Sequence, residues 1–206
     1  MTQSHYAIAL HTSSPDLGLA ISNFAGDLRQ QVWQLGQDLS TDLHQSLSDF
    51  LAPQTWADLA FIAVATGPGG FTGTRIGVVT ARTLAQQLQI PLFGLSSLAA
   101  IAQAQAETEG AIAVQMPAQR GELYAAIYQI SSAGLMVLVP DCVLTAAAWQ
   151  QALSALSAPY QLIEAEANQG KQVVAVLDLA HQRWRQGDCP DWSEVLPFYG
   201  QHPVQR

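Results

Sequence analysis

Short apolar runs separated by polar turns fill the first part of the chain, and this pattern predicts strands. Three such runs occupy residues 6–10, 17–24 and 28–35, and the turns between them are rich in Ser, Pro, Asp and Gly. The period then changes, because leucine recurs at every fourth position from 39 to 47, as on one face of a helix. We therefore expect three meandering strands followed by a helix over 38–50.

A nearly all-apolar run over 59–65 is followed by a glycine-rich turn and then by the longest helical pattern of the chain, over 72–88. Such a run is typical of a strand that is buried on both faces of a sheet. After this helix, a second group of strands and helices is expected. The predicted strands cover 90–95, 111–116, 123–130, 135–139 and 160–164, and the predicted helices end near 106, 156 and 185. Ser96 or Ser97 is expected to cap the first of these helices. Two groups of strands with their helices place the chain in the α/β class.

The turn between the strand over 59–65 and the long helix is a candidate ligand site. A glycine-rich turn that opens a helix exposes backbone N–H groups, which bind phosphates and carboxylates readily. Thr72 is expected to cap the helix by accepting a backbone N–H bond. The candidate ligand residues are Gly67, Gly69, Gly70, Thr72 and Gly73. The spacing is neither a Walker A loop nor GxGxxG, so a purely structural tight turn is the alternative.

The long helix has more apolar surface than one sheet needs to cover. Its apolar positions span roughly two-thirds of the circumference, whereas a helix on the surface of a sheet needs a stripe of about 100°. Small residues recur at every fourth position from 77 to 85, and they let another backbone come close. We predict that a second chain docks here, on Arg75, Gly77, Val78, Ala81, Arg82 and Ala85. The alternative is that a helix or loop of the same chain covers this face.

Composition narrows the range of functions. The chain of 206 residues has 8 Lys plus Arg against 16 Asp plus Glu, a formal net charge of −8. This is the wrong sign for a protein that holds a nucleic-acid backbone by itself, so any nucleic-acid role should be indirect. Cys142 and Cys189 are isolated thiols, which favours a reducing cytoplasm. No signal peptide is visible and no apolar run reaches the about 18 residues that a membrane span needs, so we expect no membrane partner.

No set of side chains predicts catalysis or metal binding. The five histidines lack the i, i+4 spacing that presents a metal pair from one helix, and no Gly-x-Ser-x-Gly elbow is present. His11 lies at a strand-to-turn junction, where its ring could face a ligand or could be an ordinary turn histidine. We therefore assign no catalytic residue and no metal ligand.

Four stretches, taken together in this order and spacing, resemble the TsaB (YeaZ) family of Gcp-like proteins. They are Thr66-Gly-Pro-Gly-Gly-Phe-Thr-Gly-Thr-Arg-Ile-Gly77, Pro91-Leu-Phe-Gly-Leu-Ser-Ser-Leu98, Gly121-Glu-Leu-Tyr124 and Pro197-Phe-Tyr199. The resemblance implies an ASKHA (actin-like ATPase, RNase H-like) fold of two lobes with a cleft between them. On this basis we expect an N-terminal lobe over 1–106, with the glycine-rich turn and the interface helices, and a smaller C-terminal lobe over 107–206.

The resemblance also implies a function and partners. It implies a non-catalytic scaffold or activator for N6-threonylcarbamoyladenosine (t6A37) modification of tRNA, paired with a TsaD-like catalytic subunit. A TsaE-like ATPase would join the assembled complex. The chain alone would form a homodimer through the same interface helices that pair with the catalytic subunit. The tRNA would be contacted only indirectly. The alternatives are a stand-alone ASKHA-type enzyme, either a small-molecule kinase or a Gcp-like peptidase, and a homodimeric binding protein.

Three positions depart from the family pattern. His11 and Pro117 stand where the family commonly has Asp, and Gly200 stands where an Arg is usual. Carboxylates at the first two positions would hold Mg²⁺ and phosphate, so their replacement argues against ATP chemistry. We therefore expect no cofactor, with nucleotide binding in the cleft as the open alternative.

Overall fold

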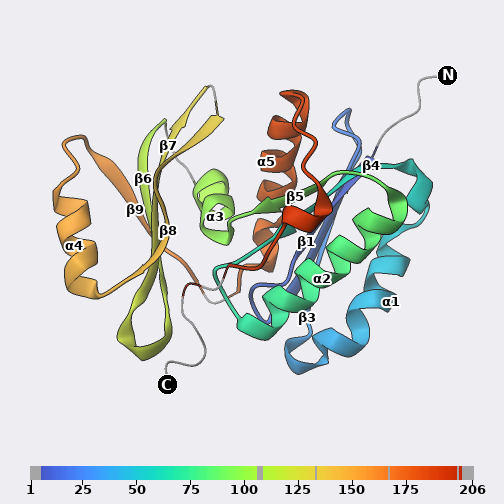
Figure 1. Ribbon diagram of the computed structural model, residues 1–206, viewed down its shortest axis with the longest axis horizontal. Helices are drawn as coiled ribbons and strands as arrows, with labels where there is room; N and C mark the ends of the chain where they lie inside the picture. The colour runs from blue at the N-terminus through green and yellow to red at the C-terminus, as the bar shows by residue number, and fades with distance from the viewer. Residues whose placement is uncertain (1–5, 106–108, 133, 167, 199, 201–206) are drawn as a thin grey trace.

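Two mixed β-sheets, one from each half of the chain, organise the fold (Figure 1). The structure is a computed structural model and describes residues 6–105, 109–132, 134–166, 168–198 and 200. In each sheet, neighbouring antiparallel strands are joined by short turns, and further strands pair in parallel, two in the first sheet and one in the second. This arrangement confirms the expected α/β class.

The first sheet has the strand order β3-β2-β1-β4-β5, so the first strand of the chain lies at its centre. β1 pairs antiparallel with β2 and parallel with β4, and β4 pairs parallel with β5. The strands are β1 (Tyr6–His11), β2 (Asp16–Ser22), β3 (Leu28–Gln34), β4 (Leu59–Ala65) and β5 (Leu92–Leu95). All five lie where the apolar runs predict them.

Helices cover both faces of the first sheet, and we call this unit the first lobe. α1 (Leu39–Leu51) and α2 (Phe71–Leu88) pack on one face, and α5 (Val173–Arg185) packs on the other against β1, β2, β4 and β5. The face toward α5 is rich in alanine, with Ala7, Ala9 and Ala63 fully buried. A helix from the second half of the chain thus completes the first lobe. The division at residues 106 and 107 stays a prediction.

The second sheet has the order β8-β7-β6-β9 and is the core of the second lobe. Its strands are β6 (Gly110–Pro117), β7 (Leu123–Ser131), β8 (Gly134–Leu144) and β9 (Tyr160–Glu164), and β8 continues past its expected end at residue 139. α3 (Ser97–Gln105) lies between the two sheets, and α4 (Ala146–Ser154) packs on the outer face of the second (Figure 1). The short 3₁₀ helices are η1 (Gly36–Asp38), η2 (Trp56–Asp58), η3 (Gln119–Gly121), η4 (Gly170–Gln172) and η5 (Trp192–Glu194).

A polar contact joins the start of α3 to the second sheet. The Ser96 hydroxyl accepts hydrogen bonds from the backbone N–H groups of Leu98 and Ala99, so Ser96 is the cap that the sequence left open between two serines. The same hydroxyl lies 3.3 Å from the Tyr128 hydroxyl, which donates to the Asp141 carboxylate at 2.7 Å. Burial raises the pKa of Tyr128 and of Asp141. This chain of hydrogen bonds holds the two lobes together across α3.

None of the helices in the described ranges has the length and apolar character of a membrane span.

α2 packs its row of small residues against the chain's own first sheet. Val78, Ala81 and Ala85 are fully buried in the core beneath α1 and α2, and a Cβ atom on Gly77 would lie 2.1 Å from the Thr12 Oγ1 atom. Glycine is needed at position 77 because Thr12 of the β1–β2 turn lies directly under the helix there. The expectation that a second chain docks on this row is thereby corrected, since the same chain covers these four residues.

The close contact at Gly77 can be tested by adding one methyl group. Gly77→Ala should lower the free energy of unfolding by about 1–3 kcal/mol, because overpacking outweighs the better helix propensity of alanine. Urea unfolding followed by circular dichroism measures this change. Gln86→Ala, at an exposed position of the same helix, should stay within about 0.5 kcal/mol of wild type. A Gly77→Ala protein as stable as wild type would contradict this packing.

Candidate functional site

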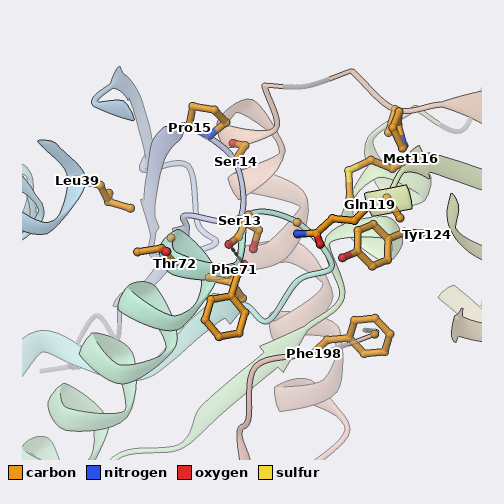
Figure 2. A pocket seen from close by; sticks show the side chains of 18 of the residues that line it. Ser13, Ser14, Pro15, Leu39, Phe71, Thr72, Met116, Gln119, Tyr124 and Phe198 are labelled. Carbon is orange, nitrogen blue, oxygen red and sulfur yellow. Dashed lines mark hydrogen bonds between the residues drawn. The ribbon is translucent and has the colours of Figure 1, made fainter. Parts of the chain in front are cut away.

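A cavity of about 990 Å³ lies between the two lobes and is the candidate site of the chain. From the first lobe it is lined by the β1–β2 turn and the glycine-rich turn, and from the second by the end of β6 and by η3. Figure 2 shows Ser13, Phe71 and Thr72 on one side and Gln119 and Tyr124 across from them. A cavity of this volume is large enough for a small organic ligand.

The wall from the first lobe is built by two interlocked turns. The Gly70 N–H donates to the Ser13 carbonyl oxygen at 2.7 Å, and the Thr12 hydroxyl donates to the Gly73 carbonyl oxygen at 2.8 Å. A Cβ atom on Gly69 would lie 2.0 Å from the Ser13 carbonyl oxygen. Glycine is therefore required for close approach of two backbones. This geometry accounts for the glycines structurally, which was the alternative to a ligand role.

Four of the five predicted ligand residues come together at the cavity. Gly69, Gly70, Thr72 and Gly73 line it, whereas Gly67 is absent from the described lining and accepts a hydrogen bond from the Ser97 N–H at 2.7 Å. The expected capping role of Thr72 is wrong. The residue at the N-cap is Gly70, and no side chain caps the helix there, because α2 begins one residue earlier than predicted. Ligand binding by these residues stays a prediction.

The opposite wall brings in two more of the stretches that carry the family resemblance. Tyr124 and Phe198 both line the cavity, and their rings meet edge to face with centroids 6.5 Å apart. Three separate motifs of the sequence thus converge on one cleft. Tyr199, the last residue of the C-terminal motif, lies outside the described residues. Ser13, Ser14 and Arg120 also line the cavity, and nothing in the residue pattern marks them beyond their place in turns.

The cleft carries little charge. Among the described residues that line it, only Arg120 and Glu166 are charged, and Glu166 forms an exposed ion pair with Lys171 at 2.9 Å. Pro117, which stands where the resemblance leads one to expect Asp, lines the cavity. Within the described ranges, no three His, Cys, Asp or Glu side chains gather closely enough to hold a metal ion. The donor set at the cleft therefore does not fit a magnesium-bound triphosphate.

His11 is buried beneath the cleft rather than facing it. Its ring is fully buried, and neither ring nitrogen has a hydrogen-bond partner in the described part of the chain. Burial lowers the pKa of His11 to about 4, because a charged imidazole would lose its hydration there. The ring is thus a neutral part of the core at neutral pH. It neither faces a ligand in the cavity nor lies exposed in a turn.

α2 exposes a different face from the one that the sequence predicted. Phe71, Arg75, Val79 and Thr83 are spaced by four residues and are all exposed, and we call these four residues the α2 outer face. Phe71 and Val79 are 45% and 53% exposed. Of the predicted interface residues, Arg75 lies on this face, and the half-buried Arg82 lies beside it with its guanidinium 5.7 Å from the centre of the Trp192 ring.

Two lobes, each a mixed sheet flanked by helices and separated by a cleft, define an actin-like fold of the ASKHA class. Two solved structures share the fold over nearly the whole chain. One is an uncharacterized protein with similarity to peptidase YEAZ from Pseudomonas aeruginosa, with a TM-score of 0.78 and 24% identity, covering 96% of this chain and 100% of that one. The other is YeaZ from Pseudomonas aeruginosa, with a TM-score of 0.76 and 22% identity, covering 95% and 99%.

Sequence comparison gives the family. The family model for TsaD, described as tRNA N6-adenosine threonylcarbamoyltransferase, matches residues 49–183. The tRNA threonylcarbamoyladenosine biosynthesis protein TsaB of Bacillus subtilis (strain 168) is 33% identical over 172 residues, which is 81% of this chain and 74% of that protein. Its namesake in Escherichia coli (strain K12) is 35% identical over 108 residues, 52% of this chain and 43% of that protein. The chain belongs to the TsaB family.

The buried neutral His11 makes stability depend on pH. The pKa of His11 is about 4 in the folded protein and about 6.5 in the unfolded chain. The neutral ring therefore makes its full contribution to the free energy of unfolding above pH 6.5, and this contribution is lost as the pH falls toward 4. Between pH 7 and pH 4, wild type should lose about 3 kcal/mol more of its free energy of unfolding than His11→Leu does.

The measurement is urea unfolding of both proteins across this pH range. His44→Leu is the matched control, because His44 is exposed on α1 and its loss should leave the pH dependence of wild type in place. If the free energy of unfolding changed with pH equally in wild type and in His11→Leu, this result would contradict the burial of a neutral ring.

Proposed function

We propose that this chain is a non-catalytic subunit for the formation of threonylcarbamoyladenosine in tRNA, and that it acts by pairing with a TsaD-like catalytic subunit. The observation that carries the proposal is the match to TsaB of Bacillus subtilis over 81% of the chain, because that protein is named for this biosynthesis. A scaffold role agrees with a cleft whose described lining residues offer only Arg120 and Glu166 as charged groups. Kinase chemistry would need carboxylates for Mg²⁺ beside the phosphates.

The α2 outer face is the proposed contact surface. Phe71 and Val79 expose large apolar side chains on one helix face, and Arg75 between them supplies a charge that can fix the orientation of a partner. Exposed apolar side chains that are grouped on one helix are typical of surfaces that another protein covers. In the absence of the catalytic subunit, two copies of the chain would pair through this same face.

The remaining parts of the assembly follow from charge. A net charge of −8 disfavours direct contact with a phosphate backbone, so the catalytic subunit would hold the tRNA. A TsaE-like ATPase would join the assembled complex, and the whole assembly would act in the cytoplasm. No cofactor is assigned to this chain, and nucleotide binding in the cleft remains a subordinate alternative.

Substitution at the centre of the α2 outer face tests the pairing. Val79→Glu should weaken the complex with the organism's own TsaD-like protein at least about tenfold, or about 1.4 kcal/mol, because a carboxylate would be buried in an apolar contact. Titration calorimetry measures the affinity, and the threonylcarbamoyladenosine content of tRNA made by the mixture measures the function.

Leu28→Glu on β3 is the matched control, since Leu28 and Val79 are both 53% exposed. The control protein should bind and support modification as wild type does. An undiminished complex with Val79→Glu would reject the α2 outer face as the contact surface. A chain that never binds the TsaD-like protein, and whose removal leaves modification unchanged, would reject the subunit role itself.

A further inference from the structure

α4 covers only part of the outer face of the second sheet. This helix has nine residues, and it buries Trp149 and Leu153 against Ala113, Ala125 and Ile127. Figure 1 shows the β7–β8 hairpin extending past the end of α4. The first sheet, in contrast, has two helices on one face and α5 on the other. Part of the outer face of the second sheet therefore has no helix over it.

The strand register identifies what this uncovered part presents. Met136 pairs with Gln129, Gln129 with Ala111, and Ala111 with Tyr160, so these four residues form one row across the sheet. Alternate residues of a strand share a face, so Ala111 points to the same side as Ala113, which lies under α4. Leu162 pairs with Ala113 and lies on that side as well. The row is therefore part of the outer face.

Large apolar side chains are exposed on this face along both edge strands, β8 and β9. Met136 is 58% exposed, Leu138 43%, Tyr160 39% and Leu162 40%, and we call these four residues the outer patch. Leu138 lies two residues after Met136, at the irregularity in the pairing of β8 with β7. Single exposed apolar residues are ordinary, but a group on one face of a sheet indicates a surface that another molecule covers.

The edges of the sheet argue against the addition of a strand. β8 contains Pro140 and an irregular register, and Pro159 directly precedes β9. Proline and bulges on edge strands block pairing with a further strand. Docking on the face therefore fits better than docking at the edge. Because α4 already covers the adjacent part of that face, a helix beside α4 would continue the same layer.

The charged residues of the second lobe indicate which kind of partner the outer patch would attract. Between residues 109 and 169 the exposed acidic residues are Glu109, Glu164 and Glu166, of which Glu166 pairs with Lys171, and the only cation, Arg120, lines the cleft. Glu109 is exposed directly before Gly110, the end of β6 that carries the row with Met136 and Tyr160. Two copies of this surface would bring like charges together, which disfavours self-association. A cationic partner would be attracted instead.

We propose that the outer patch docks a basic amphipathic helix of another protein. Its apolar stripe covers Met136, Leu138, Tyr160 and Leu162, and its Lys or Arg residues lie toward Glu109. This site is separate from the α2 outer face, because the two surfaces belong to different lobes (Figure 1). The chain would thus have a second docking surface, beyond the pairing with a catalytic subunit.

The test uses the full chain and a synthetic helical peptide of about four turns, with Leu on one face and Lys on the other. Fluorescence anisotropy measures its binding to wild type, to the double variant Met136→Ser and Leu162→Ser, and to Leu28→Ser on β3 as the matched exposed control. We expect the double variant to bind about tenfold more weakly and Leu28→Ser to bind as wild type does. A peptide with Glu in place of Lys should bind at least about tenfold more weakly to wild type.

Three results would overturn the proposal. The first is equal binding of the Leu and Lys peptide to wild type and to the double variant, which would show non-specific attraction to an acidic protein. The second is equal binding of the Lys and Glu peptides. The third is a dimer of the chain in sedimentation velocity that the double variant loses, which would make a second copy the occupant. Each result is independent of Val79→Glu, so failure here leaves the proposed function untouched.

Discussion

The contact between the β1–β2 turn and the first two turns of α2 is the constraint on which the rest of the structure depends. Thr12 and Ser13 meet this helix and the turn before it through backbone carbonyl oxygens and one hydroxyl, at places where Cβ atoms on Gly69, Gly73 and Gly77 would lie within 2.3 Å of them. Because the two backbones touch, α2 has one possible position on the sheet. That position fixes the first wall of the cleft and leaves the α2 outer face toward solvent.

The chemistry of the cleft follows from what surrounds that contact. The glycine-rich turn uses its close approach to pack on the β1–β2 turn, and the position beside it holds a buried neutral His11 instead of a carboxylate. The second wall contributes Pro117 and Arg120. The described residues that line the cleft therefore supply few charged groups, and most of them are small, apolar or uncharged.

The sequence predicts the elements of this fold well and their faces less well. Apolar runs locate every strand, and α2 differs from its prediction by one residue, because a helical period of apolar residues begins directly after the glycine-rich turn. The docking face of α2 was misplaced, since Gly77, Ala81 and Ala85 suit a close approach to any backbone, including the chain's own. Ser13 at the cleft could not be found either, because a turn residue faces a cleft only once both lobes are in place.

α5 gives the order in which this chain can fold as it is synthesised. Strands β1 to β5 emerge from the ribosome early, yet the alanine-rich face of their sheet is covered only by a helix that begins at Val173. The segment that contains Phe198 is made later still, and its Phe198 N–H donates a hydrogen bond to the Thr66 carbonyl oxygen at 2.7 Å. The second lobe, whose residues are contiguous, can therefore be complete before the first. The glycine-rich turn reaches its final surroundings only after residue 198 has been synthesised.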